Sequence, residues 1–234
     1  MKKFLLFLLP VMALSLASCE KNNEKELSGD DVIEFKDPNF FKALLENGVD
    51  SNRDGVITVN EAMAVVDVLT IMECNVSDIT EIKYFKSLEF LECIYNNLTT
   101  LDLSENTALE LLDCFTNELT SINVSKNTAL TWLDCGDNKL TSLDVKNNTA
   151  LESLSCYYNQ LTTLDVSNNV YLTELLCYEN NLKTLDLRNN FSLTSLNCGG
   201  NPLTKIILSR DNKLDDESIQ AIIEEYGNII EYVD

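Results

Sequence analysis

Oxygen-bearing side chains recur at alternate positions in the twelve residues from Asp50 to Glu61. Aspartate or asparagine stands at the first, third and fifth positions, glycine at the sixth and glutamate at the twelfth. The glycine allows the sharp turn that gathers such side chains around one point, and hard cations prefer carboxylate, amide and carbonyl oxygens. The pattern predicts one bound calcium ion. Its predicted ligands are Asp50, Asn52, Asp54, Val56 through its carbonyl, Thr58 and Glu61.

This loop matches the EF-hand calcium loop, but a second interpretation stays open. EF-hands normally pair through the residue at position 8, here Ile57, and the sequence contains no second loop. Thr58 and Glu61 also have the spacing of a capping box, in which each side chain bonds the backbone N–H of the other at a helix start. On that interpretation the acidic loop is a solvated turn. The two are compatible, because positions 9 and 12 of a calcium loop already lie at a helix start.

The composition does not indicate an enzyme. The chain of 234 residues contains no histidine, so it lacks the commonest general base, and it has no glycine-rich phosphate loop. Its 17 basic and 38 acidic residues make it strongly acidic. Nucleic acid and anionic lipid surfaces are not expected partners, because binding them requires clustered lysine and arginine.

The N-terminus has the features of an export signal. Lys2 and Lys3 precede an apolar segment that is too short for a permanent membrane span. The segment ends in Leu16-Ala-Ser-Cys19, which resembles the lipobox of bacterial lipoproteins, and this resemblance implies that Cys19 is lipidated. We therefore expect a signal peptide over residues 1–18 and a flexible tether over residues 19–35. Ordinary cleavage, with Cys19 incidental, is the alternative.

The acidic stretch after Cys19 resembles export tags that bring lipoproteins to the cell surface in some Gram-negative groups. The expected location is the cell envelope, at the surface of the outer membrane. Contact with the membrane is expected through the lipid anchor only.

Residues 88–208 repeat one pattern six times with a period of 21 residues. Cysteine and asparagine recur in register in every copy. The cysteines are Cys93, Cys114, Cys135, Cys156, Cys177 and Cys198, and the asparagines are Asn96, Asn117, Asn138, Asn159, Asn180 and Asn201.

The repeat resembles the leucine-rich repeat, whose copies stack into a solenoid. In the third copy Leu133 and Cys135 are two residues apart, so on a strand they share one face. One coil cannot bury these residues alone, whereas stacked coils bury them against the same positions of their neighbours. The resemblance implies a horseshoe with parallel β-strands on the concave face and extended segments on the convex face.

The cysteine column has two interpretations. Cysteines in an exported chain often form disulfides, but ladder cysteines point in parallel into the core, where this type of repeat otherwise has leucine. Zinc needs convergent pairs such as C-x-x-C, which are absent from the sequence. We expect buried free thiols that pack as small apolar residues.

Segments at both ends are expected to cover the open core of the repeats, which occupy residues 88–213. A small α-helical, EF-hand-like cap is predicted over residues 36–69, with Asp37 and Pro38 at its first helix start. Residues 70–87 form a degenerate first repeat, and residues 214–234 a helical C-terminal cap. Such a cap joined to leucine-rich repeats resembles the amino-terminal caps of the internalins, which are bacterial surface adhesins.

Ligand-binding residues are expected on the concave face, beside the inward columns. The fold does not require large apolar or aromatic residues at these solvent positions. Three stacked acids, Glu92, Asp113 and Asp134, repel one another, and a basic ligand would relieve that repulsion. The predicted ligand-binding residues are Phe90, Glu92, Ile94, Tyr95, Leu111, Asp113, Phe115, Trp132, Asp134, Tyr157, Tyr158 and Tyr178.

The favoured function is a non-enzymatic, adhesin-like lipoprotein that binds a protein or peptide, with calcium stabilising its cap. Three alternatives stay open. The same aromatic residues could stack on the sugar rings of a glycan, the protein could be a purely structural envelope component, or Phe90, Leu111 and Trp132 could pack on one another or against a dimer partner.

Lipidation of Cys19 predicts that Cys19→Ser moves the protein from the membrane fraction to the soluble fraction, because the substitution removes the acylated thiol. Fractionation of expressing cells, followed by immunoblotting, measures this shift. Unchanged partitioning would show that Cys19 is not the anchor.

Overall fold

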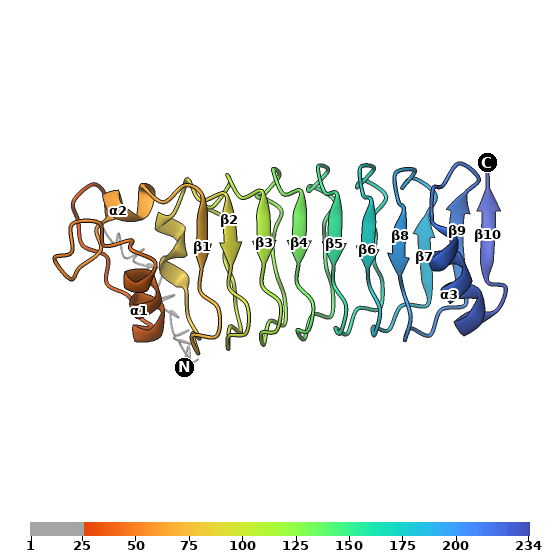
Figure 1. Cartoon of the computed structure of the whole chain (residues 1–234), viewed down its shortest axis with the longest axis horizontal. Coiled ribbons are helices and arrows are strands. Elements are labelled where there is room, and N and C mark those ends of the chain that lie inside the picture. The colour runs from red at the N-terminus through yellow and green to blue at the C-terminus, as the bar shows by residue number, and fades with distance from the viewer. Residues whose placement is uncertain (1–25) are drawn as a thin grey trace, which may run out of the picture.

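Each coil contributes one short strand to a parallel sheet that runs the length of the molecule (Figure 1). The computed structural model describes residues 26–234. Neighbouring strands are in register, so that Leu111 lies opposite Trp132 and Asp113 opposite Asp134. The predicted repeat solenoid is confirmed, and its horseshoe curvature stays a prediction. In spatial order the seven strands are β1 Val68–Thr70, β2 Phe90–Glu92, β3 Leu111–Asp113, β4 Trp132–Asp134, β5 Ser153–Ser155, β6 Glu174–Leu176 and β8 Ser195–Asn197.

Inward-facing columns form one continuous core. The central leucine of each regular strand and the cysteine two residues later are buried, as are the two apolar residues of the opposite arm, apart from the half-buried Ile122. The described cysteines, Cys74 to Cys198, are free thiols. Each coil buries its apolar residues against the next, so the stacking that the repeat predicts provides the stability of the solenoid.

The asparagine after each strand closes the coil. Asn138 donates through Nδ2 to the carbonyl oxygens of Cys135 (3.2 Å) and Gly136 (3.0 Å) in its own coil and of Cys114 (3.0 Å) in the coil before. Its Oδ1 accepts from the backbone N of Leu119 at 3.0 Å. One buried amide therefore bonds four backbone groups at the sharp turn and joins its own coil to the coil before.

A second asparagine column, which is not among the features predicted from the sequence, lies on the opposite arm. Each member is fully buried and donates through Nδ2 to two carbonyl oxygens of the preceding coil. Asn148, for example, donates to Val124 at 2.9 Å and Asn127 at 2.8 Å. The column joins the coils at a second edge, and its members are Asn106, Asn127, Asn148, Asn169 and Asn190.

The opposite arm is extended, as predicted, but forms a regular sheet only near the C-terminus. There β7 (Thr184–Leu187), β9 (Lys205–Ser209) and β10 (Ile230–Val233) pair in parallel. Earlier coils make only single bridges, such as Asp144 with Asp165.

The N-terminal segment differs from its predicted boundaries. Helix α1 (Pro38–Glu46) is capped by Asp37, and α2 (Val59–Met63) follows the acidic loop. Strand β1 begins at Val68, inside the predicted cap, because it pairs with β2. Residues 31–33, assigned to the tether, are folded: Val32 makes an antiparallel bridge with Thr58, and Ile33 is buried. The degenerate repeat has a short 3₁₀ helix, Thr80–Tyr84, in its second arm.

The C-terminal segment is part helix and part strand. Helix α3 (Asp216–Tyr226) takes the place beside β8 where a further strand would lie, and β10 follows it on the other side of the solenoid (Figure 1). Within residues 214–234, where a helical cap is predicted, α3 is followed by β10, which extends the second sheet, and the capping role of this segment stays a prediction. Within residues 26–234, no helix is both long and apolar enough to cross a membrane.

Replacing Asn138 by alanine should lower the free energy of unfolding by about 2–4 kcal/mol, because several buried backbone groups lose their partner at once. Urea denaturation followed by circular dichroism measures this change. Asn147→Ala is the matched control, since the Asn147 side chain is exposed and makes a single hydrogen bond to Ser125 at 3.3 Å. Equal destabilisation by both substitutions would contradict the role given to the buried column.

Candidate functional site

The acidic loop folds around its own backbone N–H groups. Asp50 Oδ2 accepts from Gly55 N at 2.9 Å, Asn52 Oδ1 from Asp54 N at 2.8 Å, and Asp54 Oδ1 from Val56 N at 3.0 Å. These bonds hold the side chains of positions 1, 3 and 5 on the inner side of the turn. Gly55 has a φ of 88°, a conformation that favours glycine.

Glu61 joins the two ends of this loop. Its Oε1 accepts from Ser51 N at 3.0 Å and Ser51 Oγ at 3.1 Å, while its Oε2 accepts from Thr58 N at 3.0 Å and Thr58 Oγ1 at 2.9 Å. The hydrogen bonds, that of the Thr58 backbone foremost, lower the pKa of Glu61 to about 2. The capping box is thus present, and the Glu61 carboxylate is ionised as a calcium ligand must be.

The fit of this loop to calcium is partial. The oxygen donors are those that calcium prefers, and they all come from one turn. In the part of the chain that the structure describes, however, no three His, Cys, Asp or Glu side chains are gathered closely enough to hold a metal. The calcium site stays a prediction.

Residues 31–33 take the place of a second calcium loop. Ile33 N donates to Ile57 O at 2.9 Å, and Val59 N donates to Asp31 O at 3.1 Å. Ile57, at position 8, is fully buried. The pairing that EF-hands normally make with each other is made here with the segment just before α1.

Three columns of side chains cover the outward side of the seven-stranded sheet, which we call the strand face; it is the predicted concave face. The first strand position gives Phe90, Leu111 and Trp132, all half-buried. The third gives Glu92, Asp113 and Asp134, which are opposite one another in the register. Beyond the strands come Ile94, Phe115 and Gly136. The structure thus brings the predicted acids together between two apolar columns.

The acids are less exposed than the sequence analysis expected. Asp134 is only 8% exposed, and its Oδ1 accepts from Gly136 N at 2.8 Å. Burial, together with Asp113, raises the pKa of Asp134 to about 7, and burial also raises that of Asp113. Glu92 accepts from Thr70 Oγ1 at 2.8 Å. Within residues 26–234, none of the three acids has an ion-pair partner.

Tyr157 covers Asp134, and Gly136 makes this possible. A Cβ on Gly136 would lie 2.8 Å from the Tyr157 ring, so only glycine lets that ring lie across the neighbouring coil. The Tyr157 side chain also acts to lower the pKa of Asp134, against the larger effect of burial. Gly136 is not among the residues predicted from the sequence. A glycine at the position that holds tyrosine in the next copy of the repeat is the signal that could have revealed this contact, because it leaves room for the ring.

An aromatic row runs along one edge of the strand face. Tyr157 stacks on Tyr178 with ring centroids 4.7 Å apart and 3° between the planes, and it contacts Phe115 at 5.7 Å. Tyr95 contacts Phe115 at 5.4 Å, and Tyr158 contacts Tyr178 at 5.4 Å. Tyr95 and Tyr158 are 47% and 52% exposed. The row is therefore preorganised by ring contacts but open to solvent on one side.

Tyr95 and Tyr158 occupy a strained position. Their φ values are 53° and 47°, as at every turn residue that precedes a ladder asparagine. This left-handed conformation costs a non-glycine residue roughly 1 kcal/mol. A glycine, as in Gly200, would avoid the cost, so the fold itself does not select tyrosine here.

Asp134→Asn should raise the free energy of unfolding at pH 8 by about 1–3 kcal/mol, because it removes a buried charge and keeps an oxygen for Gly136 N. The folded-state pKa is raised, so the wild type should lose stability as pH rises from about 4 to about 7, and Asp134→Asn should lose less. Urea denaturation between pH 4 and pH 8 measures both. If the wild type and Asp134→Asn lose stability in parallel between pH 4 and pH 8, the pKa of Asp134 is not raised.

Comparison with known proteins gives structural likenesses only. No protein-family model and no curated protein matches the chain. Internalin C2 from Listeria monocytogenes is similar with 20% identity and a TM-score of 0.51, over 85% of this chain and 94% of that one. The APL1 leucine-rich repeat domain is similar with 19% identity and a TM-score of 0.53, over 72% and 57%.

The functional domain of InlJ from Listeria monocytogenes, which includes a cysteine ladder, has 28% identity and a TM-score of 0.48, over 85% of this chain and 56% of that one. The present chain thus spans little more than half of that domain. Together, the parallel register, the stacked coils and the likeness to internalin C2 and APL1 show that the chain has the leucine-rich repeat fold.

Proposed function

We propose that this protein is a non-enzymatic module that binds a protein or peptide on its strand face. The fold supports this proposal, because stacked coils present a broad rigid surface whose exposed residues can change without altering the core. One solved structure with this fold is the LRIM1/APL1C complex, which has 20% identity and a TM-score of 0.52 over 71% of this chain and 36% of that one.

The aromatic row is the observation that carries the proposal. Tyr95 and Tyr158 are exposed at strained positions, and their rings are fixed by contact with Phe115, Tyr157 and Tyr178. Tyrosine and tryptophan supply most binding energy at protein interfaces because they bury a large area at little entropic cost. A rigid, half-open row of such rings is suited to a partner that covers it.

The acid column favours a basic partner. Glu92, Asp113 and Asp134 stand in adjacent strands, roughly 4.8 Å apart, and no lysine or arginine of the described chain pairs with them. A lysine or arginine of the ligand would stabilise the carboxylates and so lower the pKa of Asp134. Binding by this column should weaken with added salt.

A glycan ligand is the second candidate, because stacked Tyr157 and Tyr178 offer a flat aromatic surface of the kind that sugar rings contact. The acids give no comparable support to a neutral sugar. Binding of a neutral glycan that is insensitive to salt would favour this candidate over a basic polypeptide.

We further propose that the module is an adhesin-like lipoprotein at the surface of the outer membrane. Support comes from the lipobox-like sequence before Cys19, which lies outside the described residues. The lipid would anchor the chain, and residues 20–30 would separate the solenoid from the membrane.

Calcium binding at Asp50 to Glu61 is proposed as a stabilising element of the N-terminal cap. An ion held by this loop would tie α1 to α2 and to residues 31–33. Those segments cover the open end of the first coil through buried Phe40, Leu44 and Ile57.

Once a ligand has been isolated by pull-down with the chain from Glu20 onward, Trp132→Ala and Tyr158→Ala should each weaken its binding by about 2 kcal/mol or more, as for aromatic residues at an interface centre. Isothermal titration calorimetry measures this. Asp144→Asn and Asp165→Asn on the opposite arm are controls that preserve the turn-forming oxygen. If the controls abolish binding, or Tyr158→Ala does not change it, the strand face is not the binding surface.

Calcium at a hundredfold excess over its Kd should stabilise the cap by about 2.7 kcal/mol, which raises the melting temperature. Glu61→Gln should lose this shift because the amide cannot coordinate the ion through two charged oxygens. Glu46→Gln, at an exposed position of α1, is the control. A melting temperature that is the same with calcium and with chelator would leave the capping box as the only role of Glu61.

A further inference from the structure

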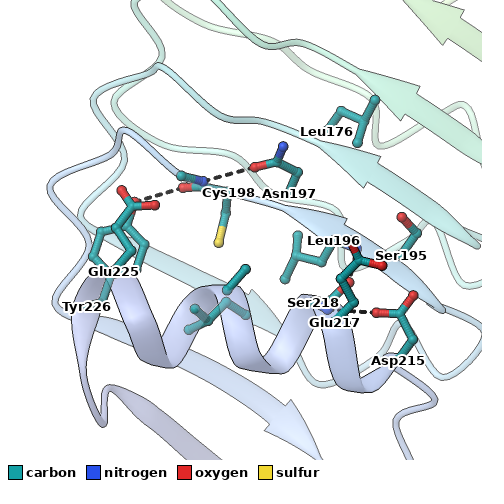
Figure 2. A pocket seen from close by; sticks show the side chains of 13 residues that line it. Leu176, Ser195, Leu196, Asn197, Cys198, Asp215, Glu217, Ser218, Glu225 and Tyr226 are labelled. Atoms are coloured by element: carbon teal, nitrogen blue, oxygen red, sulfur yellow. Dashed lines mark hydrogen bonds between the residues drawn. The ribbon is translucent and has the colours of Figure 1, made fainter.

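A cavity of about 340 Å³ lies between α3 and β8, at the C-terminal end of the seven-stranded sheet (Figure 2). Its volume is at the small end of the roughly 300–1,000 Å³ that ligand pockets have, which suits one amino-acid residue. Leu196 and Ile222 form its buried apolar part, and Asp215, Glu217 and Glu225 line its exposed part. It is separate from the aromatic row and the acid column.

The cavity exists because α3 is attached to the β8 strand and the turn after it only at its two ends (Figure 2). At one end Leu196 N donates to Ser218 Oγ at 3.0 Å. At the other end Tyr226 donates through its hydroxyl to Cys198 O at 3.0 Å, and Glu225 Oε1 accepts from Gly200 N at 2.7 Å. Between these attachments the helix does not fill the place that a further strand would occupy.

The backbone C=O of Leu196, in β8, and the backbone N–H of Cys198, just after β8, face this gap. Cys177 N donates to Asn197 O at 2.8 Å, so the backbone of Asn197 faces β6. Because backbone groups alternate along a strand, those of Leu196 and Cys198 face α3. Leu196 N and Cys198 O are bonded to the helix, but in the described chain no hydrogen bond is found for Leu196 C=O or Cys198 N–H. Both residues are buried, 3% and 2% exposed.

Such a pair of groups binds one residue of a parallel strand. In the inner coils the cysteine N–H donates to the carbonyl of the next strand, as Cys93 does to Asp113 O at 2.8 Å. A buried donor or acceptor that makes no hydrogen bond lowers the stability of the fold. The pair therefore favours a ligand that supplies one N–H and one C=O. The amide groups on either side of a single peptide residue have this geometry.

The acids at the rim specify the side chain of that residue. Glu217 and Glu225 are exposed, and no ion pair is found for either within residues 26–234. No lysine or arginine lines the cavity. The residue that bonds both groups has its side chain on the face of Asn197, as Asp113 has in its own coil, so a long basic side chain can pack its alkyl part against Ala221 while its charged end reaches Glu217.

We propose that this cavity binds one lysine or arginine residue of the polypeptide ligand, in addition to the strand face. The residue would donate its N–H to Leu196 C=O, accept from Cys198 N–H and direct its cation towards Glu217. The identity of the ligand rests on the proposed function, but the cavity can be tested separately.

The spacing of the sheet gives a sequence requirement for the ligand. From β4, which carries Asp134, to the place beyond β8 where the ligand residue would lie is four steps of roughly 4.8 Å, or about 19 Å. An extended peptide rises about 3.3 Å per residue, so the basic residue at Asp134 and the one in the cavity are about six positions apart.

The probe for the cavity is N-acetyl-L-arginine N-methylamide, which contains one basic residue between two amides. With the ¹⁵N-labelled chain from Glu20 onward, titration should shift the amide signal of Cys198. N-acetyl-L-norleucine N-methylamide, which lacks the cation, should bind at least about fivefold more weakly. Glu217→Gln should weaken the arginine probe by a similar factor, and Ala221→Leu should abolish the Cys198 shift by filling the cavity.

Glu224→Gln is the matched control, since Glu224 is an exposed carboxylate of the same helix that does not line the cavity. Equal effects of Glu217→Gln and Glu224→Gln, equal binding of the two probes, or no shift at Cys198 would each overturn the proposal. Trp132→Ala should leave the probe unaffected. If the probe binds as expected while Trp132→Ala and Tyr158→Ala leave a captured polypeptide bound, the cavity stands and the strand-face function fails.

Discussion

The turn after each strand is the constraint on which the rest of the structure depends. Every coil reverses there through a residue in the left-handed conformation, and the turn is possible only because a buried asparagine pairs the backbone groups that it leaves open. Those bonds reach the coil before as well as the asparagine's own coil. Closing one coil therefore fixes the register of the next, and a period of 21 residues is kept wherever the asparagine recurs.

The fixed register of the strands gives every inner strand two neighbours but leaves the strands at the two ends of the sheet with only one. In the middle it places equal positions opposite each other, so residues that the fold does not need, such as Trp132 and Tyr157, can form a surface without disturbing the core. At the ends the last strand has no neighbour on its outer side. The N-terminal end is covered by α1, α2 and residues 31–33, whereas α3 covers the C-terminal end incompletely and leaves groups of Leu196 and Cys198 unpaired. Both candidate binding regions thus follow from one stacking rule.

Much of the fold is predictable from the sequence because six copies of the repeat carry the same residue types at the same positions. The strands, the buried cysteines and the ladder asparagines all follow from residues that recur at fixed spacing, and the start of α3 follows from Asp215 and the acids after it. Features that depend on contacts between different coils are not visible in the pattern. The burial of Asp134 requires the Tyr157 ring to cross from the next coil over Gly136. The pairing of residues 31–33 with the loop at Thr58 depends on a contact between a single short segment and a single loop, which no repeat signals.

The acids of this chain divide into two groups by the direction in which the fold shifts their pKa. On the opposite arm, hydrogen bonds from the residue two positions later lower the pKa of Asp102, Asp144, Asp165 and Asp186, so those carboxylates stabilise the folded state in their charged form. On the strand face, burial raises the pKa of Asp113 and Asp134, so their charged forms destabilise it. Asp113 and Asp134 accept the same kind of hydrogen bond, from Phe115 N and Gly136 N, but burial outweighs it, so the fold alone does not explain why these two positions carry carboxylates. A basic ligand would reverse the sign of that cost, which is the physical reason to place the ligand on the strand face and not on the opposite arm.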